Sequence, residues 1–391
     1  MTNAAEFAPP AGGPFVSVVV PARDAASHLP RCLDALSKSD YARFEIIVVD
    51  DASSDATASV ARSRGCKVLR LAAQAGPAAA RNRGAREARG DVLLFVDADV
   101  EARADTIARA AAHFTKPGAA TADAGASDDG ASNLDEGGRV AAVFGSYDDA
   151  PAETNFASQF KNLFHHHTHQ RSPPRASTFW AGCGAIRREV FDAVGGFDAR
   201  RYSRPSVEDI ELGYRLRRAG FRVALDPELQ AKHLKRWTLA SLVRADVRDR
   251  AVPWSRLILE GGGMIDELNL RVAARASAAL VALALSLLAL ALLMLAASLF
   301  APAAAPPAAW PFALSLAALA ALAVVIAVNR DLYGYLLRLR GARFAAASCA
   351  MHLLYFLYSG ATFALCAAGH ALRRRGGATL GAPVKDARRA G

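Results

Sequence analysis

The sequence predicts an α/β fold, a Rossmann-like doubly wound sheet, followed by interfacial helices and a helical transmembrane part. Up to residue 232, short β-branched apolar runs alternate with helical patterns of about 10 to 15 residues, as in parallel strands joined by crossover helices. From residue 273 onward Ala, Leu, Val and Phe dominate, and much of the 52% hydrophobic content of the 391 residues lies there. We therefore expect a globular domain over 15–232 and a membrane part over 271–372.

The expected elements follow one another in a regular order. Apolar runs bounded by turn residues indicate strands, and spaced apolar residues closed by a glycine indicate helices. Strands are expected at 15–22, 44–51, 67–72, 91–99, 139–147 and 221–227, helices near 27–37, 53–65, 77–89 and 207–220, and a further strand leading into a helix within 177–191.

Two segments depart from this pattern. Residues 1–14 are expected to be disordered, and they lack the basic start and apolar core of a secretory signal, so we expect the globular domain to stay in the cytosol. Residues 116–138 are small, acidic and low in complexity, which predicts a flexible insert. The five cysteines show no C-x-x-C pair, which favours reduced thiols.

The C-terminal part has the composition of a multi-pass membrane anchor. Residues 233–270 contain two tryptophans among mixed apolar and arginine positions, which favours amphipathic helices in the headgroup layer over an ordinary surface helix. Spans are expected at about 273–300, 311–328 and 344–371.

The basic residues predict the orientation of these spans. The first loop has none, whereas the second carries Arg330, Arg338, Arg340 and Arg343, so the globular domain and the second loop are expected on the cytosolic face of the cell membrane. A third span would export the basic tail, residues 373–391. Either the third segment is a re-entrant or in-plane hairpin, or the positive-inside rule fails here.

The net charge of +10 raises the question of a nucleic acid partner. Many of the basic residues lie in 232–256, 330–343 and 373–389, near the membrane segments, and they are not interleaved with aromatic residues. Anionic headgroups explain this placement better, so no nucleic acid partner is expected.

Two carboxylates end the predicted fourth strand in "LLFVDADV", residues 93–100. The chain can turn Asp97 and Asp99 toward one point, where they repel each other unless a cation lies between them. Mg²⁺ or Mn²⁺ takes one or two carboxylates and fills its remaining positions with phosphate and water. The pair predicts a metal–diphosphate site, although a solvated turn is the alternative for this motif alone.

Other polar residues are expected at the same edge, because ligands of doubly wound sheets bind beyond the carboxyl ends of the strands. Asp50 and Asp51 end the second strand, where they can accept hydrogen bonds from a nucleobase or ribose. Arg81 precedes the acidic strand and suits a phosphate, unless it lies on a solvated helix face. No G-x-G-x-x-G follows the first strand, which argues against a dinucleotide-dependent oxidoreductase.

Several segments together resemble the family 2 glycosyltransferases, whose A-type fold has a mixed sheet. They are "VSVVVPARDAASHLPRCLDAL", "FEIIVVDDASSDAT", "ARNRGAREARGDVLLFVDAD", "GAIRREVFDAVGGFD" and "EDIELGYRLRRAGFRVALDP", in the family's order over residues 15–233. The resemblance implies a nucleotide-sugar site at Pro21, Asp50, Asp51, Arg81 and Asp97, a metal held by Asp97, Asp99 and His233, and a general base at Asp209 with Glu208 beside it.

These implied roles agree with the chemistry of inverting sugar transfer. A base must take the proton of the acceptor hydroxyl, and a cation must accept charge from the departing diphosphate. Glu208 and Asp209 also suit a helix N-terminus, so capping is a second reading of the pair.

Two motifs bear on how the enzyme works. Processive members carry Q-x-x-R-W, but "HLKRW" has His233 in place of Gln and follows Asp209 too closely. The run "HHHTHQ", residues 165–170, has no Cys or Asp partner at metal-site spacing, and an acceptor-side loop is the preferred interpretation.

The sequence thus predicts a membrane-anchored inverting glycosyltransferase. Its expected donor is a UDP- or GDP-linked sugar, and its expected acceptor is a lipid or lipid-linked molecule at the cytosolic membrane face. A processive polysaccharide synthase and a non-catalytic scaffold that binds sugar nucleotides are the alternatives.

Overall fold

The structure is a computed structural model that describes residues 12–115, 139–300, 307 and 309–379. Most of the predicted disordered N-terminus, the predicted insert 116–138 and the end of the basic tail lie outside these residues. The chain forms two compact units, Met1–Leu242 with Glu267–Asn269, and Val243–Asp266 with Leu270–Gly391.

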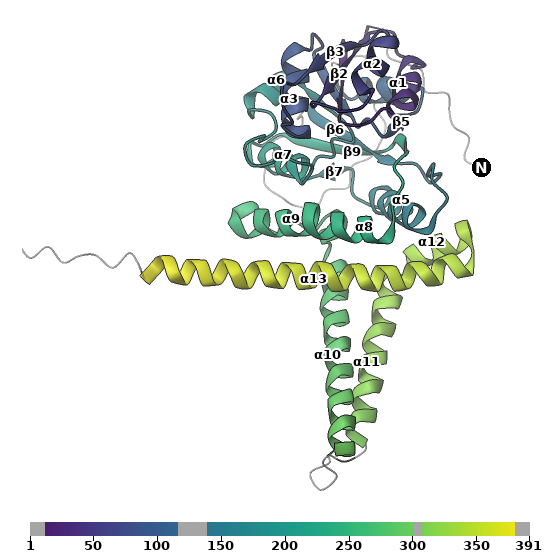
Figure 1. Ribbon diagram of the computed structural model, residues 1–391, viewed down its shortest axis with the longest axis vertical. Coiled ribbons are helices and arrows are strands. Elements are labelled where there is room, and N and C mark those ends of the chain that lie inside the picture. Colours follow the sequence, from purple (N-terminus) through teal and green to yellow (C-terminus); the bar gives the residue numbers. More distant parts are fainter. Residues whose placement is uncertain (1–11, 116–138, 301–306, 308, 380–391) are drawn as a thin grey trace, which may run out of the picture. The chain divides into compact units, whose positions relative to one another are not determined.

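The first unit contains one mixed sheet, to which the described residues contribute nine strands in the order β3-β2-β1-β4-β8-β6-β9-β5, with β7 beside β9 (Figure 1). The strands β3, β2, β1 and β4 are parallel, whereas β8 is antiparallel to both β4 and β6. The strands are β1 (Val16–Ala22), β2 (Phe44–Asp50), β3 (Lys67–Arg70), β4 (Val92–Val96), β5 (Val100–Ala102), β6 (Val140–Tyr147), β7 (Arg175–Ala176), β8 (Cys183–Arg187) and β9 (Arg222–His233). The predicted mixed sheet is confirmed.

Helices cover both faces of this sheet, because successive residues of a buried strand point to opposite sides. Val18 packs in one hydrophobic cluster with Leu33 of α1 and Ile107 of α4, and Val19 packs in the other with Ala85 of α3 and Leu212 of α7. The helices of this unit are α1 (Leu29–Ser37), α2 (Thr57–Ser63), α3 (Pro77–Glu87), α4 (Thr106–Ala112), α5 (Phe156–Gln170), α6 (Arg188–Ala193) and α7 (Glu208–Arg218), and α8 (Leu239–Ala245) begins at its end.

The structure differs from the sequence prediction in two places that matter for the site. The histidine run was expected in a loop but forms the end of α5, where Phe156, Phe160 and Phe164 stack at four-residue intervals along the helix. The last strand was expected to end at residue 227 but continues to His233, because β6 and β5 pair with its residues 230–233.

The second unit consists of helices. A helical run with π-type turns comprises η1 (Asp246–Ala251), α9 (Val252–Leu257) and η2 (Ile258–Gly262). A short turn, η3 (Leu268–Leu270), precedes α10 (Val272–Phe300), α11 (Ala309–Val328), α12 (Arg330–Arg340) and α13 (Ala342–Thr379). Among the described residues, α10, α11 and α13 are long and apolar enough to cross a membrane.

The three long helices differ in how they pack against one another. α10 and α11 lie side by side (Figure 1) and share a cluster of Ala284, Ala318 and Ala321 to which α13 contributes nothing. α13 joins a second cluster through Phe356, together with Val281 near the start of α10 and Val325 near the end of α11. Contact confined to one end of the α10–α11 pair indicates that α13 crosses the pair there instead of running along it.

A glycine allows helix α7 to pack closely against the segment that follows β7. A Cβ atom at Gly213 would run into the backbone of Thr178, which cannot move aside as a flexible side chain could. We predict that Gly213→Ala destabilises the protein by about 1–3 kcal/mol, because this crowding outweighs the better helix propensity of alanine. The measurement is the thermal unfolding midpoint of the purified full chain, with Ala219→Ser, exposed at the end of the same helix, as the control. A midpoint raised by Gly213→Ala would contradict this account of the packing.

Candidate active site

The carboxyl ends of the parallel strands bring the predicted acidic residues to one edge of the sheet. Asp50 is the last residue of β2, and Asp97 follows β4 directly. β1 lies between these two strands, so their ends are two strand spacings apart, about 10 Å. This separation leaves room for a nucleoside at one side and a diphosphate at the other.

One side of this edge contains Asp50, Asp51 and Pro21, which the sequence predicted to bind the nucleotide sugar. Asp50 is fully buried; its Oδ1 accepts a hydrogen bond from the backbone N–H of Ser53 at 2.9 Å, and Arg70 lies 3.4 Å from its Oδ2. The Asp51 carboxylate instead accepts the backbone N–H groups of residues 75 and 76, so it braces the loop before α3. Pro21 is partly buried at the end of β1.

Arg81 occupies the centre of the site. It is 4% exposed; its Nη2 donates to Asp97 Oδ1 at 2.7 Å and its Nη1 to Glu208 Oε1 at 2.9 Å. Although burial opposes its charge, the Asp97 and Glu208 carboxylates raise the pKa of Arg81. The guanidinium predicted to hold a phosphate is thus turned toward two carboxylates.

Asp97 and Asp99 have different environments although one residue separates them. Burial raises the pKa of Asp97, and the neighbouring charge of Asp99 adds to this effect while Arg81 opposes it. Burial acts on Asp99 in the same direction, but the neighbouring side chains of His233 and Lys235 outweigh it and lower the pKa of Asp99 to about 2. Asp99 is therefore a carboxylate at neutral pH.

The predicted base lies at the N-terminus of α7. Asp209 Oδ2 accepts the backbone N–H of Ala181 at 3.1 Å, and the next residue, Gly182, accepts the N–H of Asp97 through its carbonyl at 3.2 Å. Burial, followed by the charge of Glu208, raises the pKa of Asp209 to about 6. Hydrogen bonds through residues 181–182 thus link Asp209 to Asp97, and Arg81 links Asp97 to Glu208, the neighbour of Asp209.

His233 lies next to Asp99 at the end of β9. Its Nε2 lies 3.6 Å from Asp99 Oδ2, and its Nδ1 lies 2.8 Å from Oδ1 of Asn162 in α5. The ring stacks on Tyr147, with centroids 4.5 Å apart and planes 15° apart. The sequence reasoning missed Asn162 and Tyr147; only the position of Tyr147 at the end of a strand could have indicated it.

The donor set can be compared with the needs of a divalent cation. No group of three or more His, Cys, Asp or Glu side chains within the described ranges is arranged to hold a metal. Asp99 and His233, however, present an oxygen and a nitrogen 3.6 Å apart. Neighbouring ligands of an octahedral ion at about 2.0–2.1 Å are about 2.9 Å apart, so a side-chain shift of less than about 1 Å would let both atoms bind one cation. Two protein ligands, with the rest from phosphate and water, suit Mg²⁺ or Mn²⁺. The residues present fit such an ion.

Two histidines of the run, His165 and His169, pack against aromatic rings. His165 contacts the rings of Tyr147 and Trp180 at centroid distances of 4.4 and 4.8 Å. The ring of His169 lies 3.9 Å from that of His165, and burial lowers the pKa of His169 to about 4, so it is neutral at pH 7. The imidazole of His165 therefore packs against Tyr147, and that of His169 packs against His165.

The chain is similar to known glycosyltransferases in sequence and in fold. Residues 17–195 match Glycosyl transferase family 2, and residues 140–343, just over half of the chain, match Glycosyl transferase family 21. Glycosyltransferase AglE of Haloferax volcanii is 36% identical over 93 residues, 22% of this chain and 31% of that protein. The 4,4'-diaponeurosporenoate glycosyltransferase of Staphylococcus haemolyticus is 40% identical over 92 residues, 22% of this chain and 24% of that protein.

The chain therefore spans less than a third of the length of these two curated relatives. Among solved structures, a mannosyltransferase from Pyrobaculum calidifontis in complex with GDP-Man and Mn²⁺ is similar with a TM-score of 0.46 and 19% identity, over 94% of this chain and 90% of that one. With these family matches, the chain belongs to the glycosyltransferases: its first part, which contains most of the mixed sheet, matches family 2, just over half of its length matches family 21, and long apolar helices follow the sheet.

Proposed function

We propose that this protein is an inverting glycosyltransferase that moves a sugar from a UDP- or GDP-linked donor to a lipid or lipid-linked acceptor at the membrane surface. The observation that carries the proposal is the grouping of Asp97 and Asp209 around Arg81 and the 181–182 segment, with Asp99 beside Asp97. A degenerate binding scaffold has no need for a base and an acidic pair held together in this way.

The residues divide the reaction between them. Asp50 is placed to accept hydrogen bonds from the nucleoside, and Asp99 with His233 would hold Mg²⁺ or Mn²⁺, which when bound takes up negative charge on the diphosphate. Asp209 accepts the proton of the acceptor hydroxyl as its oxygen bonds to the anomeric carbon. The bond from that carbon to the diphosphate breaks, and its electron pair leaves with the nucleoside diphosphate. Attack opposite the leaving group inverts the anomeric configuration.

Arg81 serves this arrangement as a positioning residue. Its two hydrogen bonds fix Asp97 and Glu208 relative to each other, and Glu208 precedes the base in sequence. The nearby positive charge also limits how far burial can raise the pKa of Asp209. Because both Nη atoms of Arg81 donate to carboxylates, Arg81 affects donor binding by positioning Asp97 and not by contacting the donor.

A lipid acceptor is favoured by the long apolar helices and by one relative. The curated glycosyltransferase from S. haemolyticus is named for 4,4'-diaponeurosporenoate, and this chain pairs its catalytic unit with three membrane-length helices. The processive alternative remains disfavoured, because the position of Gln in Q-x-x-R-W is taken by His233, whose ring faces Asp99.

The proposed reaction is tested by transfer to lipid. Full-length protein in native membranes is incubated with radiolabelled UDP- and GDP-sugars and Mn²⁺, and label is counted in the lipid extract. We expect label with the wild type and a loss of about 10²- to 10⁴-fold in rate for Asp209→Asn, with donor binding retained, because the substitution removes only the base. Label found only in water-soluble products would contradict a lipid acceptor.

The raised pKa of Asp209 predicts an acid limb in the pH profile. Because only the ionised carboxylate can accept a proton, kcat/KM should rise with pH up to about 6 and then level off. Glu208→Gln removes the neighbouring charge that helps to raise this pKa, so the limb should move to lower pH. Glu211→Gln, one turn further along α7, is the matched control and should leave the limb in place. A limb that does not move in Glu208→Gln would argue against Asp209 as the base.

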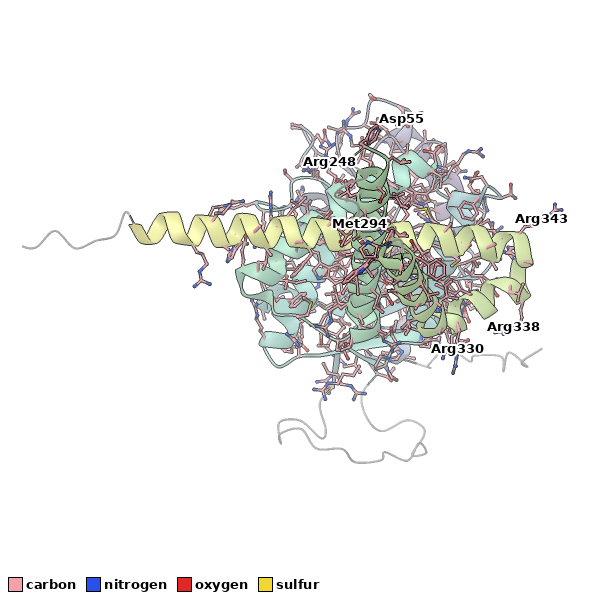
Figure 2. All side chains as sticks on the ribbon, turned by 90° about the horizontal axis from the view of Figure 1, so that it is seen from below. Asp55, Arg248, Met294, Arg330, Arg338 and Arg343 are labelled. Atoms are coloured by element: carbon pink, nitrogen blue, oxygen red, sulfur yellow. The ribbon has the colours of Figure 1, made fainter. Side chains whose placement is uncertain are left out.

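We also propose a topology for the second unit. α10 and α11 form a spanning hairpin, and α13 lies in the headgroup plane at the end where α10 begins and α11 ends. The exposed leucines of α13, Leu354, Leu357, Leu365 and Leu372, fall on one side of the helix, as an in-plane helix requires. Figure 2 shows Arg330 at the start of α12 and Arg338 and Arg343 near the junction of α12 with α13. Basic residues on this connecting helix favour a cytosolic location for it.

This topology predicts the location of the C-terminus. A fluorescent protein fused after residue 391 should fluoresce in the cytosol of a bacterial host, and alkaline phosphatase fused there should be inactive, because an even number of spans returns the chain to the starting side. The same reporters inserted between α10 and α11 should give the opposite pattern. Phosphatase activity at the C-terminus would show that α13 crosses the membrane.

A further inference from the structure

We propose that Asn162 is a positioning residue that fixes the tautomer of His233 and so makes its Nε2 a metal ligand. This inference rests on the proposed function, because it assumes that a divalent cation binds between His233 and Asp99. Asn162 lies on α5, more than 60 residues before His233 in the sequence, and it is 1% exposed. No sequence motif marks it.

The hydrogen bonds of Asn162 determine which atom faces the histidine. Its Nδ2 donates to the backbone carbonyl of Ser158 at 2.9 Å, and a carbonyl oxygen can only accept. The amide nitrogen is therefore committed to that carbonyl. The amide oxygen is then the atom 2.8 Å from His233 Nδ1.

The amide oxygen in turn determines the proton on the imidazole. Because an amide oxygen cannot donate, His233 Nδ1 must carry the hydrogen of this bond. In the neutral ring the lone pair is then on Nε2, the nitrogen that faces Asp99. The 3.6 Å between Nε2 and Asp99 Oδ2 is too long for a hydrogen bond, and two electron-rich atoms at that distance suit a cation between them.

The ring is also held in position by packing. His233 is 5% exposed, and Tyr147 stacks on its face at 4.5 Å. Stacking fixes the plane of the imidazole but not which nitrogen is protonated. Asn162 supplies that second restraint, in the way that metal-bound histidines usually donate their other N–H to an oxygen acceptor.

The test compares Mn²⁺ binding by the purified full chain in the presence of UDP or GDP. Pulsed EPR of the bound Mn²⁺ should show the nitrogen coupling of an imidazole ligand in the wild type. Asn162→Leu removes the acceptor at similar volume and should lose this coupling, with Mn²⁺ affinity weakened about 10- to 100-fold. Asn162→Asp keeps an oxygen acceptor for Nδ1–H and should retain the coupling.

Ser158→Ala is the matched structural control. Its hydroxyl, one turn earlier on α5, accepts the backbone N–H of Trp237, and the substitution leaves the Ser158 carbonyl in place. It should keep the nitrogen coupling even if the protein becomes less stable. The inference is overturned if Asn162→Leu retains both the coupling and the affinity, or if Mn²⁺ supports sugar transfer by the wild type without any nitrogen coupling. Absence of sugar transfer by the wild type would instead count against the proposed function.

Discussion

The site depends on one buried cation, the guanidinium of Arg81. Asp97, Glu208 and Asp209 approach one another at the edge of the sheet, and burying three carboxylates together is unfavourable unless a positive charge offsets their repulsion. Arg81 provides it with both Nη atoms and is fixed by packing against Phe197. Removing one partner of such a buried network typically lowers the free energy of unfolding by about 3–5 kcal/mol. Because Arg81 lies on α3, Glu208 on α7 and Asp97 after β4, the contacts that order the site also hold these two helices to the sheet.

This constraint explains why chemically identical side chains can take different roles. The pKa of Asp99 is about 2 because the neighbouring His233 and Lys235 side chains outweigh burial, whereas that of Asp209 is about 6 because burial is reinforced by Glu208. A carboxylate that stays ionised suits a cation, and one that titrates near neutral pH suits proton transfer. The division of labour follows from the neighbours of each group and not from its place in a motif.

The sequence predicted the parts of the site that depend on strand order. Asp50 and Asp97 lie at the ends of parallel strands. The apolar runs of the sequence were enough to identify these strands, and the carboxyl ends of parallel strands meet at one edge of the sheet. The sequence could not predict that the guanidinium of Arg81 turns inward, because a helix face looks the same in sequence whether it meets solvent or carboxylates. Asn162 was missed for a related reason. The segment with the histidine run was not recognised as part of a helix, α5, and the contact of Asn162 with His233 joins segments that are distant in the sequence.

The second unit bears on how many sugars are added per encounter. A processive synthase must pass its polymer through the membrane, which requires a polar path between helices. Here α10 and α11 close on each other through Ala284, Ala318 and Ala321, and small residues at such a contact let the helices approach tightly. Leucines such as Leu292 and Leu293 are exposed on the outer side of α10, where lipid suits them. In the topology that we propose, such a closed hairpin would anchor the catalytic unit but offer a growing chain no route, which supports the proposed transfer of one sugar to an acceptor that stays at the surface.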